Sequence, residues 1–481
     1  MSRLMNEIAT NSQRKGFNPI VGDMYLQQEK YLSWYRGSVN DFHFYKRNVN
    51  GKTKQFEMLT MNLPKKAVEA WTSLIWNTRC GIKVNTKTLQ DRLDDVLYRN
   101  NFYSSFGGLL EKAFALGNGF IIEYIANNKV EIDFITLRNA VVVSHNNNKI
   151  NGIVTYNQYK MNKDNYLTHL TYHYTADGEY VIEHEVFESK DSNKLGSLSN
   201  DAIYKVFSYD EVANMMHQDD KGNITYKVSY NSTKPFFQHI RPNITNNFDI
   251  ESPLGISVFA NELDKAKAAD TKYTATEREV VQNKTRIMVN SEWLKTKAED
   301  DEETGAMQFI KYYDENDDAI MGIPAQDDEK LMEFYQGQFR LEPLEMSLEN
   351  DVKRFGWGVG LGNYFSYTEE GVYQNEANVL HSNSVTWKNK VKHETLIEEA
   401  LVEMVHSIME LEYQLGNISL NQLNALKVDI MFDDSLVQDD TSRREKLKEL
   451  ADDGYIPKWK VVKEELGVDE ATAKGMVNDN N

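Results

Sequence analysis

The chain has 481 residues, of which 41% are hydrophobic and 26% are charged. This composition predicts a folded protein, and the length suggests roughly two to four folding units. The formal net charge is −19. Such a charge argues against a protein that grips nucleic acid by neutralising phosphates, because that grip needs clustered lysines and arginines. It is compatible with a protein that surrounds nucleic acid without holding it.

The cysteine content and the lengths of the apolar runs indicate in which cellular compartment the protein folds. Cys80 is the only cysteine, so the chain has no internal disulfide and no cysteine metal cluster, and a lone thiol fits folding in a reducing cytoplasm. The first residues lack a basic segment followed by an apolar one, so we expect no secretory signal. No apolar run approaches the ~20 residues of a transmembrane helix, and we expect no membrane partner.

In the first half of the chain, the spacing of apolar residues changes once, from a helical pattern to a β-strand pattern. The first ~60 residues are polar with an aromatic cluster, and residues 64–78 and 89–116 then carry helical spacing. We expect a break in the second helix near Asn100 and a stop at Gly117. From residue 120 to about 245, short β-type runs are separated by Asn, Gly and Asp turn signals, which predicts an antiparallel sheet region.

Long helices dominate the second half. Ser252 to Gly255 opens a predicted helix that runs to about Arg286 with a sparse apolar stripe, which favours packing against neighbours in a bundle or ring. Residues 331–355 are predicted to be helical, with a possible break at Pro343. A very long helix follows from about residue 375 to 413, and its second half has one apolar face, formed by Ile397, Leu401, Met404, Ile408 and Leu411. A short strand over 428–432 and two or three small helices complete the chain.

The stretch from Gly356 to Gly362 is glycine-rich, and such a stretch could bind the phosphates of a nucleotide. A phosphate cradle needs a loop that runs from a strand into a helix N-terminus. Here the loop follows a helix and leads into a long polar loop, so we predict a flexible hinge.

An acidic stretch follows the predicted helix that ends near Arg286. Between Glu299 and Glu329 there are twelve acidic residues and one basic residue, Lys311. The stretch is either a solvated, self-repelling loop or an acidic docking surface for a basic partner.

Catalytic and metal motifs give no positive sign of an enzyme. His169 and His173 have metal spacing on a helix, but they lie in a predicted strand, where ordinary sheet histidines are the better interpretation. A group of aspartates surrounds the strand near residue 430 and could bind a divalent cation, but without a glycine-punctuated loop we interpret it as turns and helix caps. These residues are Asp429, Asp433, Asp434, Asp439 and Asp440. We expect no catalytic residue, no metal and no cofactor.

The order of segments resembles that of portal proteins from long-tailed phages that infect Gram-positive bacteria. Tyr31–Gly37 (YLSWYRG) looks like the family's N-terminal aromatic signature, and Leu97–Gly119 is similar to a helix that ends in an Ala-Leu-Gly-Gly turn, with Asn118 displacing the second glycine. Further matches are Val130–Ile135, Ser252–Ser257 with Glu277–Val289, Asp429–Ser435 and Ala451–Pro457. One departure is Gln374–Ala377, where the family often has Thr-Ala-Thr-Glu.

The resemblance implies a mixed α+β phage portal fold assembled as a ring of about twelve subunits, with long stem and wing helices, a β-rich wing and a small α/β clip. The implied domains are wing 1–252, stem helix 253–287, clip 288–330, returning stem helix 331–359, tunnel loop 360–375, long wing helix 376–413 and crown 414–481.

The same resemblance implies functional residues. The DNA-channel tunnel loop would comprise Tyr364, Phe365, Ser366, Tyr367, Thr368, Glu369, Glu370, Tyr373 and Gln374. Candidates for the channel wall of the stem are Lys265, Lys267, Lys272, Lys284 and Arg286. Candidates for docking at the clip are Glu299, Asp300, Asp301, Glu302 and Glu303.

The implied role is a channel at one capsid vertex for genome packaging, head-tail joining and DNA ejection. The implied partners are other copies of the chain, double-stranded DNA, the terminase motor, head-completion or adaptor proteins, and the major capsid and scaffold proteins. The location would be the portal vertex of the virion, after synthesis in the bacterial cytoplasm. The alternatives are another structural virion protein without a DNA channel, such as a minor capsid or baseplate component, and a metal-dependent nuclease that uses the aspartates near residue 430.

Overall fold

The computed structural model describes most of the chain. The described residues are 3–20, 22–49, 52–147, 149–162, 165–218, 224–282, 286–290, 295–300, 307–312, 320–323, 332–335, 340–362, 365, 376–433, 448, 451, 457–461 and 474–475. The chain forms two compact units: unit 1 comprises residues 1–38, 64–262 and 356–481, and unit 2 comprises residues 39–63 and 263–355.

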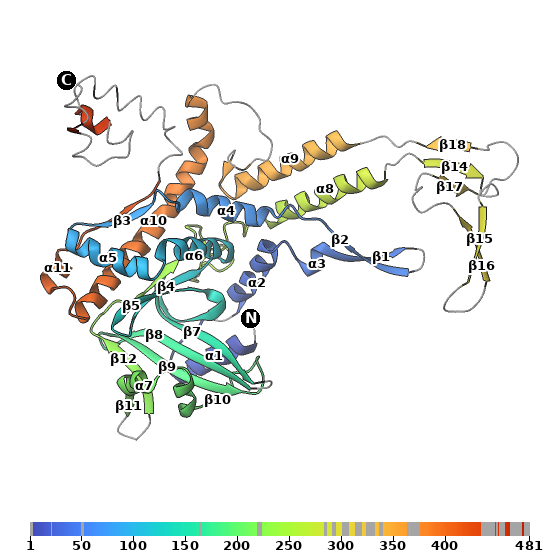
Figure 1. The fold of residues 1–481 in the computed structure, drawn as a ribbon. Helices are drawn as coiled ribbons and strands as arrows, with labels where there is room; N and C mark the ends of the chain where they lie inside the picture. Colours follow the sequence, from blue (N-terminus) through green and yellow to red (C-terminus); the bar gives the residue numbers. More distant parts are fainter. Residues whose placement is uncertain are drawn as a thin grey trace. The chain divides into compact units, whose positions relative to one another are not determined.

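Unit 1 combines helices with three antiparallel sheets (Figure 1). Its helices are α1 (Arg3–Arg14), α2 (Asp23–Tyr35), α4 (Leu63–Ile75), α5 (Lys87–Arg99), α6 (Phe102–Leu116), α7 (Tyr209–Met215), α10 (Glu376–Gln414) and α11 (Leu420–Asn424). Its strands are β3 (Gly81–Val84), β4 (Gly119–Ala126), β5 (Lys129–Thr136), β6 (Ala140–Asn146), β7 (Lys149–Asn162), β8 (Asn165–Ala176), β9 (Glu179–Ser189), β10 (Ser197–Leu198), β11 (Met216–Gln218), β12 (Ile224–Tyr230), β13 (Phe237–Ile240) and β19 (Val428–Met431).

The predicted antiparallel region is present but is divided between two sheets. The larger sheet has the order β11-β12-β9-β8-β7-β6, with β10 paired to β9, and the smaller has the order β13-β4-β5. The β4–β5 hairpin pairs with β13, which follows it by about a hundred residues, and not with the adjacent β6. Periodicity reveals strands but not their partners, so the division could not be predicted.

The core of unit 1 lies around the smaller sheet. Helices α6 and α10 both pack against β4 and β5. Five consecutive β4 residues, Gly119 to Glu123, are buried, so both faces of the strand are covered. The predicted apolar face of α10 is confirmed, because Ile397, Leu401, Met404, Ile408 and Leu411 are each at most 1% exposed.

The helix predicted from Ser252 begins eleven residues later, as α8 at Leu263. Residues 252–258 are buried and non-helical, because they pack on the end of α6. The Asn118 side chain bonds both the N–H (2.8 Å) and the carbonyl oxygen (3.1 Å) of Gly255, and the Val258 N–H bonds the Phe114 carbonyl (3.1 Å). Asn118, which displaces the glycine expected from the family, therefore has a structural role.

The described part of unit 2 contains two long helices, five short strands between them, and a separate hairpin preceded by a short helix. The helices are α8 (Leu263–Gln282) and α9 (Leu341–Gly358), and the strands between them are β14 (Arg286–Asn290), β15 (Lys295–Asp300), β16 (Met307–Tyr312), β17 (Ile320–Ile323) and β18 (Met332–Tyr335). The hairpin comprises α3 (Asn40–His43), β1 (Phe44–Val49) and β2 (Lys52–Glu57). The sequence predicted residues 39–63 to belong with the rest of 1–252, whereas here they join α8 and α9.

Two helix boundaries in unit 2 correct the sequence prediction. Arg286 lies in β14, so α8 ends earlier than expected. Residues 332–335, predicted as helix, form β18 and pair with β14. Pro343 lies in the first turn of α9, where the missing N–H has no helical partner to lose, so it does not break the helix.

Buried histidines in the larger sheet generate a pH prediction. Burial lowers the pKa of His169 to about 4 and the pKa of His173 to about 3. The unfolded chain therefore binds more protons between pH ~6.5 and these values, so the free energy of unfolding should fall as the pH falls through this window.

In the variant His173→Gln this loss should be smaller by about 2 kcal/mol between pH 7 and pH 5, because one depressed titration is removed. Thermal unfolding at the two pH values measures it. The exposed His217→Gln is the control, and an equal change in both variants would contradict the prediction.

Candidate functional site

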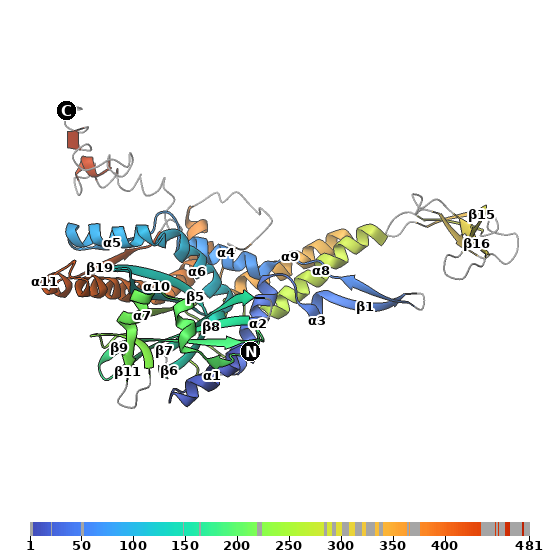
Figure 2. The same cartoon turned by 60° about the horizontal axis from the view of Figure 1, so that its bottom comes forward.

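Helices α8 and α9 form an antiparallel pair, and they lie side by side in both ribbon views (Figures 1 and 2). The Lys272 ammonium lies 2.6 Å from an Asp351 carboxylate oxygen and 3.3 Å from the Ser347 carbonyl oxygen. Further along, Arg340 and Glu279 pair at 3.3 Å. The Asp351 side chain is 7% exposed, so this ion pair has fixed geometry.

The lysines proposed for a channel wall do not all behave alike. The Lys272 side chain points toward α9, where it forms an ion pair with Asp351. Lys267 is exposed and lies 3.8 Å from Asp264, one turn earlier. Lys265 is half-buried. Lys284 lies outside the described residues, and so does the side chain of Arg286.

A buried carboxylate on α8 holds the hairpin. Asp270 accepts hydrogen bonds from the Met61 N–H (2.7 Å), the Thr60 hydroxyl (3.1 Å) and the His43 ring (3.1 Å). The other His43 ring nitrogen accepts from the Val39 N–H, so Nε2 carries the proton toward Asp270. Burial raises the pKa of Asp270, and these bonds oppose that rise. Nothing in the sequence pairs residue 43 with residue 270, so this contact was missed.

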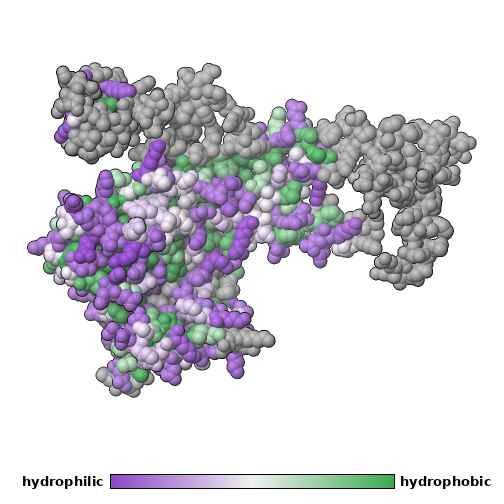
Figure 3. Space-filling model, in the orientation of Figure 1, coloured by the Kyte–Doolittle hydropathy of each residue, from purple (hydrophilic) through white to green (hydrophobic). Residues whose placement is uncertain are grey.

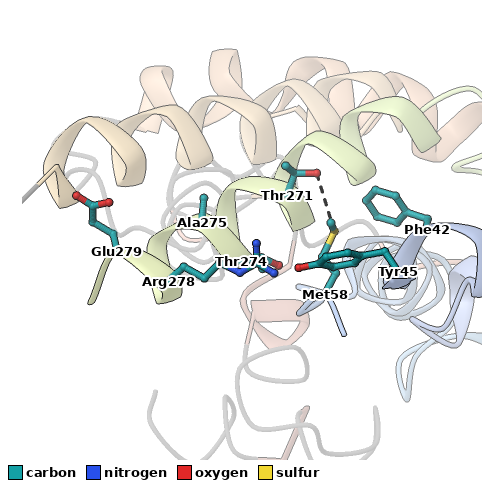
Figure 4. A pocket seen from close by; sticks show the side chains of 8 residues that line it. All are labelled: Phe42, Tyr45, Met58, Thr271, Thr274, Ala275, Arg278 and Glu279. Carbon is teal, nitrogen blue, oxygen red and sulfur yellow. Dashed lines mark hydrogen bonds between the residues drawn. The ribbon is translucent and has the colours of Figure 1, made fainter. Parts of the chain in front are cut away.

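A hollow opens between α8 and the hairpin (Figure 4). Its volume is about 440 Å³, and it is lined by Phe42, Tyr45, Met58, Thr271, Thr274, Ala275, Arg278 and Glu279. The Arg278 guanidinium lies 5.5 Å from the centre of the Tyr45 ring. Arg278 makes no hydrogen bond or ion pair within the described part of unit 2. The lining therefore combines apolar side chains with two threonines, one positive group and one negative group, and the negative group, Glu279, pairs with Arg340.

The glycine-rich stretch is a packed turn, and the prediction of a flexible hinge is wrong. Carbonyl oxygens of residues 359, 360 and 361 accept bonds from Trp71 (3.0 Å), Asn389 (3.0 Å) and Thr386 (2.7 Å). Gly360 has φ +84°, which disfavours any side chain. A Cβ on Gly358 would lie 2.0 Å from the Glu262 carboxylate. Close packing, not mobility, explains these glycines.

The tunnel-loop candidates are largely unplaced. Phe365 packs against Gly356, whose Cβ position would lie 2.7 Å from it. The other candidates lie outside the described residues: Tyr364, Ser366, Tyr367, Thr368, Glu369, Glu370, Tyr373 and Gln374.

The clip candidates lie in or beside strand β15. Glu299 and Asp300 belong to β15, which pairs antiparallel with β16, and their side chains are outside the described residues. Asp301, Glu302 and Glu303 lie entirely outside the described residues. Strand β14 pairs parallel with β17 and antiparallel with β18.

The histidines and aspartates weighed as metal ligands have other contacts. His169 Nε2 lies 3.1 Å from His184 Nδ1, and His173 lies 2.9 Å from the Tyr180 hydroxyl. Asp433 accepts from the Asn77 amide (3.0 Å) and pairs with Arg79 (3.6 Å). Asp434, Asp439 and Asp440 are among the undescribed residues. Over the described ranges, no three His, Cys, Asp or Glu side chains are grouped to hold a metal ion.

One comparison identifies the family. The model of the family described as phage portal protein, SPP1 Gp6-like, matches residues 23–474. The chain belongs to the phage portal protein family. Portal proteins form the DNA channel at one capsid vertex and serve in genome packaging and head-tail joining. They are structural proteins rather than enzymes. A search of curated proteins found no match to this portal chain.

Among the described residues, no helix is both long enough and apolar enough to cross a membrane. Membership of the portal family implies an oligomeric ring in the virion, with capsid, terminase and DNA as partners. In a ring built from one repeated chain, each copy contacts its two neighbours through two different faces.

Gly360→Ala should lower the free energy of unfolding by about 1–2 kcal/mol, because alanine is strained at φ +84° and its methyl group would lie 2.8 Å from the Asn389 amide nitrogen. Thermal unfolding of the purified protein measures it. Gly108→Ala is the matched control: that glycine lies within α6 with no atom near its Cβ position, so alanine should stabilise the helix. Equal stability of the two variants would show that the turn at 356–362 is not tightly packed.

Asp270→Ala should free the hairpin, because it leaves the Met61 N–H, the Thr60 hydroxyl and the His43 N–H without their acceptor. Amides of β1 and β2 should then exchange hydrogen about tenfold faster or more, as measured by mass spectrometry. Asp264→Ala on the same helix is the control, because that side chain is 98% exposed. Unchanged exchange in Asp270→Ala would mean that the hairpin is held by other contacts.

Proposed function

We propose that helices α8 and α9 form the stem of a DNA channel built from about twelve copies. A helix that leaves unit 1 and a second that returns antiparallel to it, joined through short strands, is the observation that carries this assignment. Strands β14 to β18 would then form the clip, which faces the packaging motor during filling and head-completion proteins afterwards. Unit 1 would supply the wing and, from residue 414 onward, the crown.

Charge supports a conduit that does not trap its cargo. Each phosphate neutralised by a fixed lysine or arginine strengthens binding to DNA. The chain carries a net −19, and the segment 363–374 contains two acids and no base. On α8 the ion pair with Asp351 removes Lys272 from the basic groups that could face DNA. The proposed channel wall therefore repels phosphate over most of its surface, with Lys265, Lys267, Lys284 and Arg286 as local exceptions.

The acidic stretch 299–329 fits a docking role at the clip. Twelve acids with one base attract basic surfaces and raise association rates. The residues proposed for this contact are Glu299 to Glu303. A partner with a basic surface would bind more weakly as salt is added, since exposed charges are screened.

The proposed role of residues 360–375 as the tunnel loop has a direct test. The double variant Glu369→Lys and Glu370→Lys should reduce the length and yield of packaged DNA, because new cations would bind phosphates in the channel. Rings should still form, as seen by negative-stain microscopy and native mass measurement.

The matched control reverses two adjacent acids elsewhere. Glu398 and Glu399 are neighbouring exposed residues on α10, so Glu398→Lys with Glu399→Lys makes the same change of charge. Normal packaging in the 369/370 variant would exclude the tunnel-loop assignment. Normal rings in both variants with failed packaging only in the first would support it.

A further inference from the structure

The faces of unit 2 suggest how one copy meets the next. In a ring, a surface on one side of each copy must fit a different surface on the other side of its neighbour. Unit 2 has a hollow beside α8 (Figure 4), and α9 carries exposed side chains. The inference rests on the family's ring, and it adds the residues that join the copies.

The hollow has an apolar part, and its rim carries Arg278 and Glu279, of which Glu279 already pairs with Arg340 within the copy. Phe42, Tyr45 and Met58 form one wall, and Ala275 lies on the α8 side (Figure 4). Arg278 stands over the Tyr45 ring and has no carboxylate partner among the described residues. A flexible apolar side chain next to a carboxylate would fill such a site, and a thioether pairs favourably with aromatic edges.

The outer face of α9 carries that combination. Met346 is 60% exposed, although methionine is usually buried. Glu342 lies one turn before it on the same face of the helix, is exposed, and has no ion pair within the part of the chain that the structure describes. Figure 3 shows apolar surface among polar residues on the α8–α9 pair.

The register of the two helices places these groups at matching levels. Glu279 lies beside Arg340, and Lys272 lies beside Ser347 and Asp351. In an antiparallel pair, residue 275 is therefore level with about residue 346, and residue 278 with about residue 342. If the ring axis is parallel to the two helices, neighbouring copies are related by rotation alone. Equivalent residues then lie at the same height along the axis in every copy.

The hairpin gives a second reason for a neighbour on this side. Strands β1 and β2 form a two-stranded sheet to which no other described strand pairs. Such a hairpin is marginally stable in water unless another element packs on it. Asp270 fixes its base, and a side chain from the next copy between Tyr45 and Ala275 would cover its inner face.

We propose that Met346 of each copy fills the hollow of the neighbouring copy, and that Glu342 of the same helix pairs with the neighbour's Arg278. The occupant is a second copy of this chain. The contact repeats at every interface of the ring, so a small change in each contact has a large effect on assembly.

A charge exchange tests the pairing. Arg278→Glu and Glu342→Arg should each reduce the yield of rings at least about tenfold, because each places like charges together at every interface. The double variant with both changes should restore the yield to within about twofold of the unaltered chain, since the pair is re-formed with reversed signs. Native mass measurement and negative-stain microscopy of the purified chain count the rings.

Two controls isolate the contact. Arg278→Glu combined with Glu399→Arg makes the same changes of charge but places the new arginine on an exposed position of α10, so the yield of rings should stay as low as in Arg278→Glu alone. Circular dichroism and thermal unfolding of the single variants should match the unaltered chain, because Arg278 and Glu342 have no ion pairs within the copy to lose.

A thiol cross-link gives an independent measurement. Cys80 is buried, so Ala275→Cys with Met346→Cys introduces the accessible thiols. A short bismaleimide should link them into a ladder of multimers on a denaturing gel, and either single variant should give monomers.

The outcomes separate this inference from the proposed function. Rings formed by Arg278→Glu as readily as by the unaltered chain, or no ladder from the double cysteine variant, would overturn the contact and leave the channel role intact. Normal packaging in the 369/370 variant, together with a restored yield of rings in the Arg278→Glu and Glu342→Arg double variant, would exclude the tunnel-loop assignment and leave the contact between copies supported.

Discussion

The carboxylate of Asp270 is the contact on which unit 2 depends. It is 2% exposed and collects three hydrogen bonds from residues 43, 60 and 61, so the two ends of the hairpin are tied to the middle of α8. An uncompensated charge at this depth would be costly, and the surrounding donors offset that cost. This tie holds the hairpin beside α8, and Tyr45 and Phe42 of the hairpin line the hollow together with residues of the helix.

The sequence predicted local structure well where one pattern was strong. Helix α10 and its buried face, the break between α5 and α6, and the strands from β4 to β9 all follow from apolar spacing and from turn residues such as Asn101 and Gly117, which adopt positive φ. The family was also predictable, because it depended on the order of segments along the chain and not on any single motif.

The failures share one cause, which is contact between distant residues. Residues 252–258 were predicted to open a helix, but Asn118 and Phe114 bond their backbone and hold them in a non-helical conformation. The glycines at 356–362 look mobile, but Glu262, Trp71 and Asn389 pack against them. The assignment of Lys272 to a channel wall could not anticipate Asp351, 79 positions later. Periodicity cannot report such pairs, and the candidate site is built mostly from them.

The antiparallel direction of α8 and α9 has an electrostatic consequence for the proposed channel. Each helix carries the equivalent of roughly half a positive charge at its N-terminus and half a negative charge at its C-terminus. Since Arg340 near the start of α9 lies beside Glu279 near the end of α8, the two dipoles point in opposite directions and largely cancel. A ring of such pairs would add almost no axial field of its own. The potential felt by DNA along this part of the channel would then be set by side chains alone, and it would favour neither entry nor exit through the backbone.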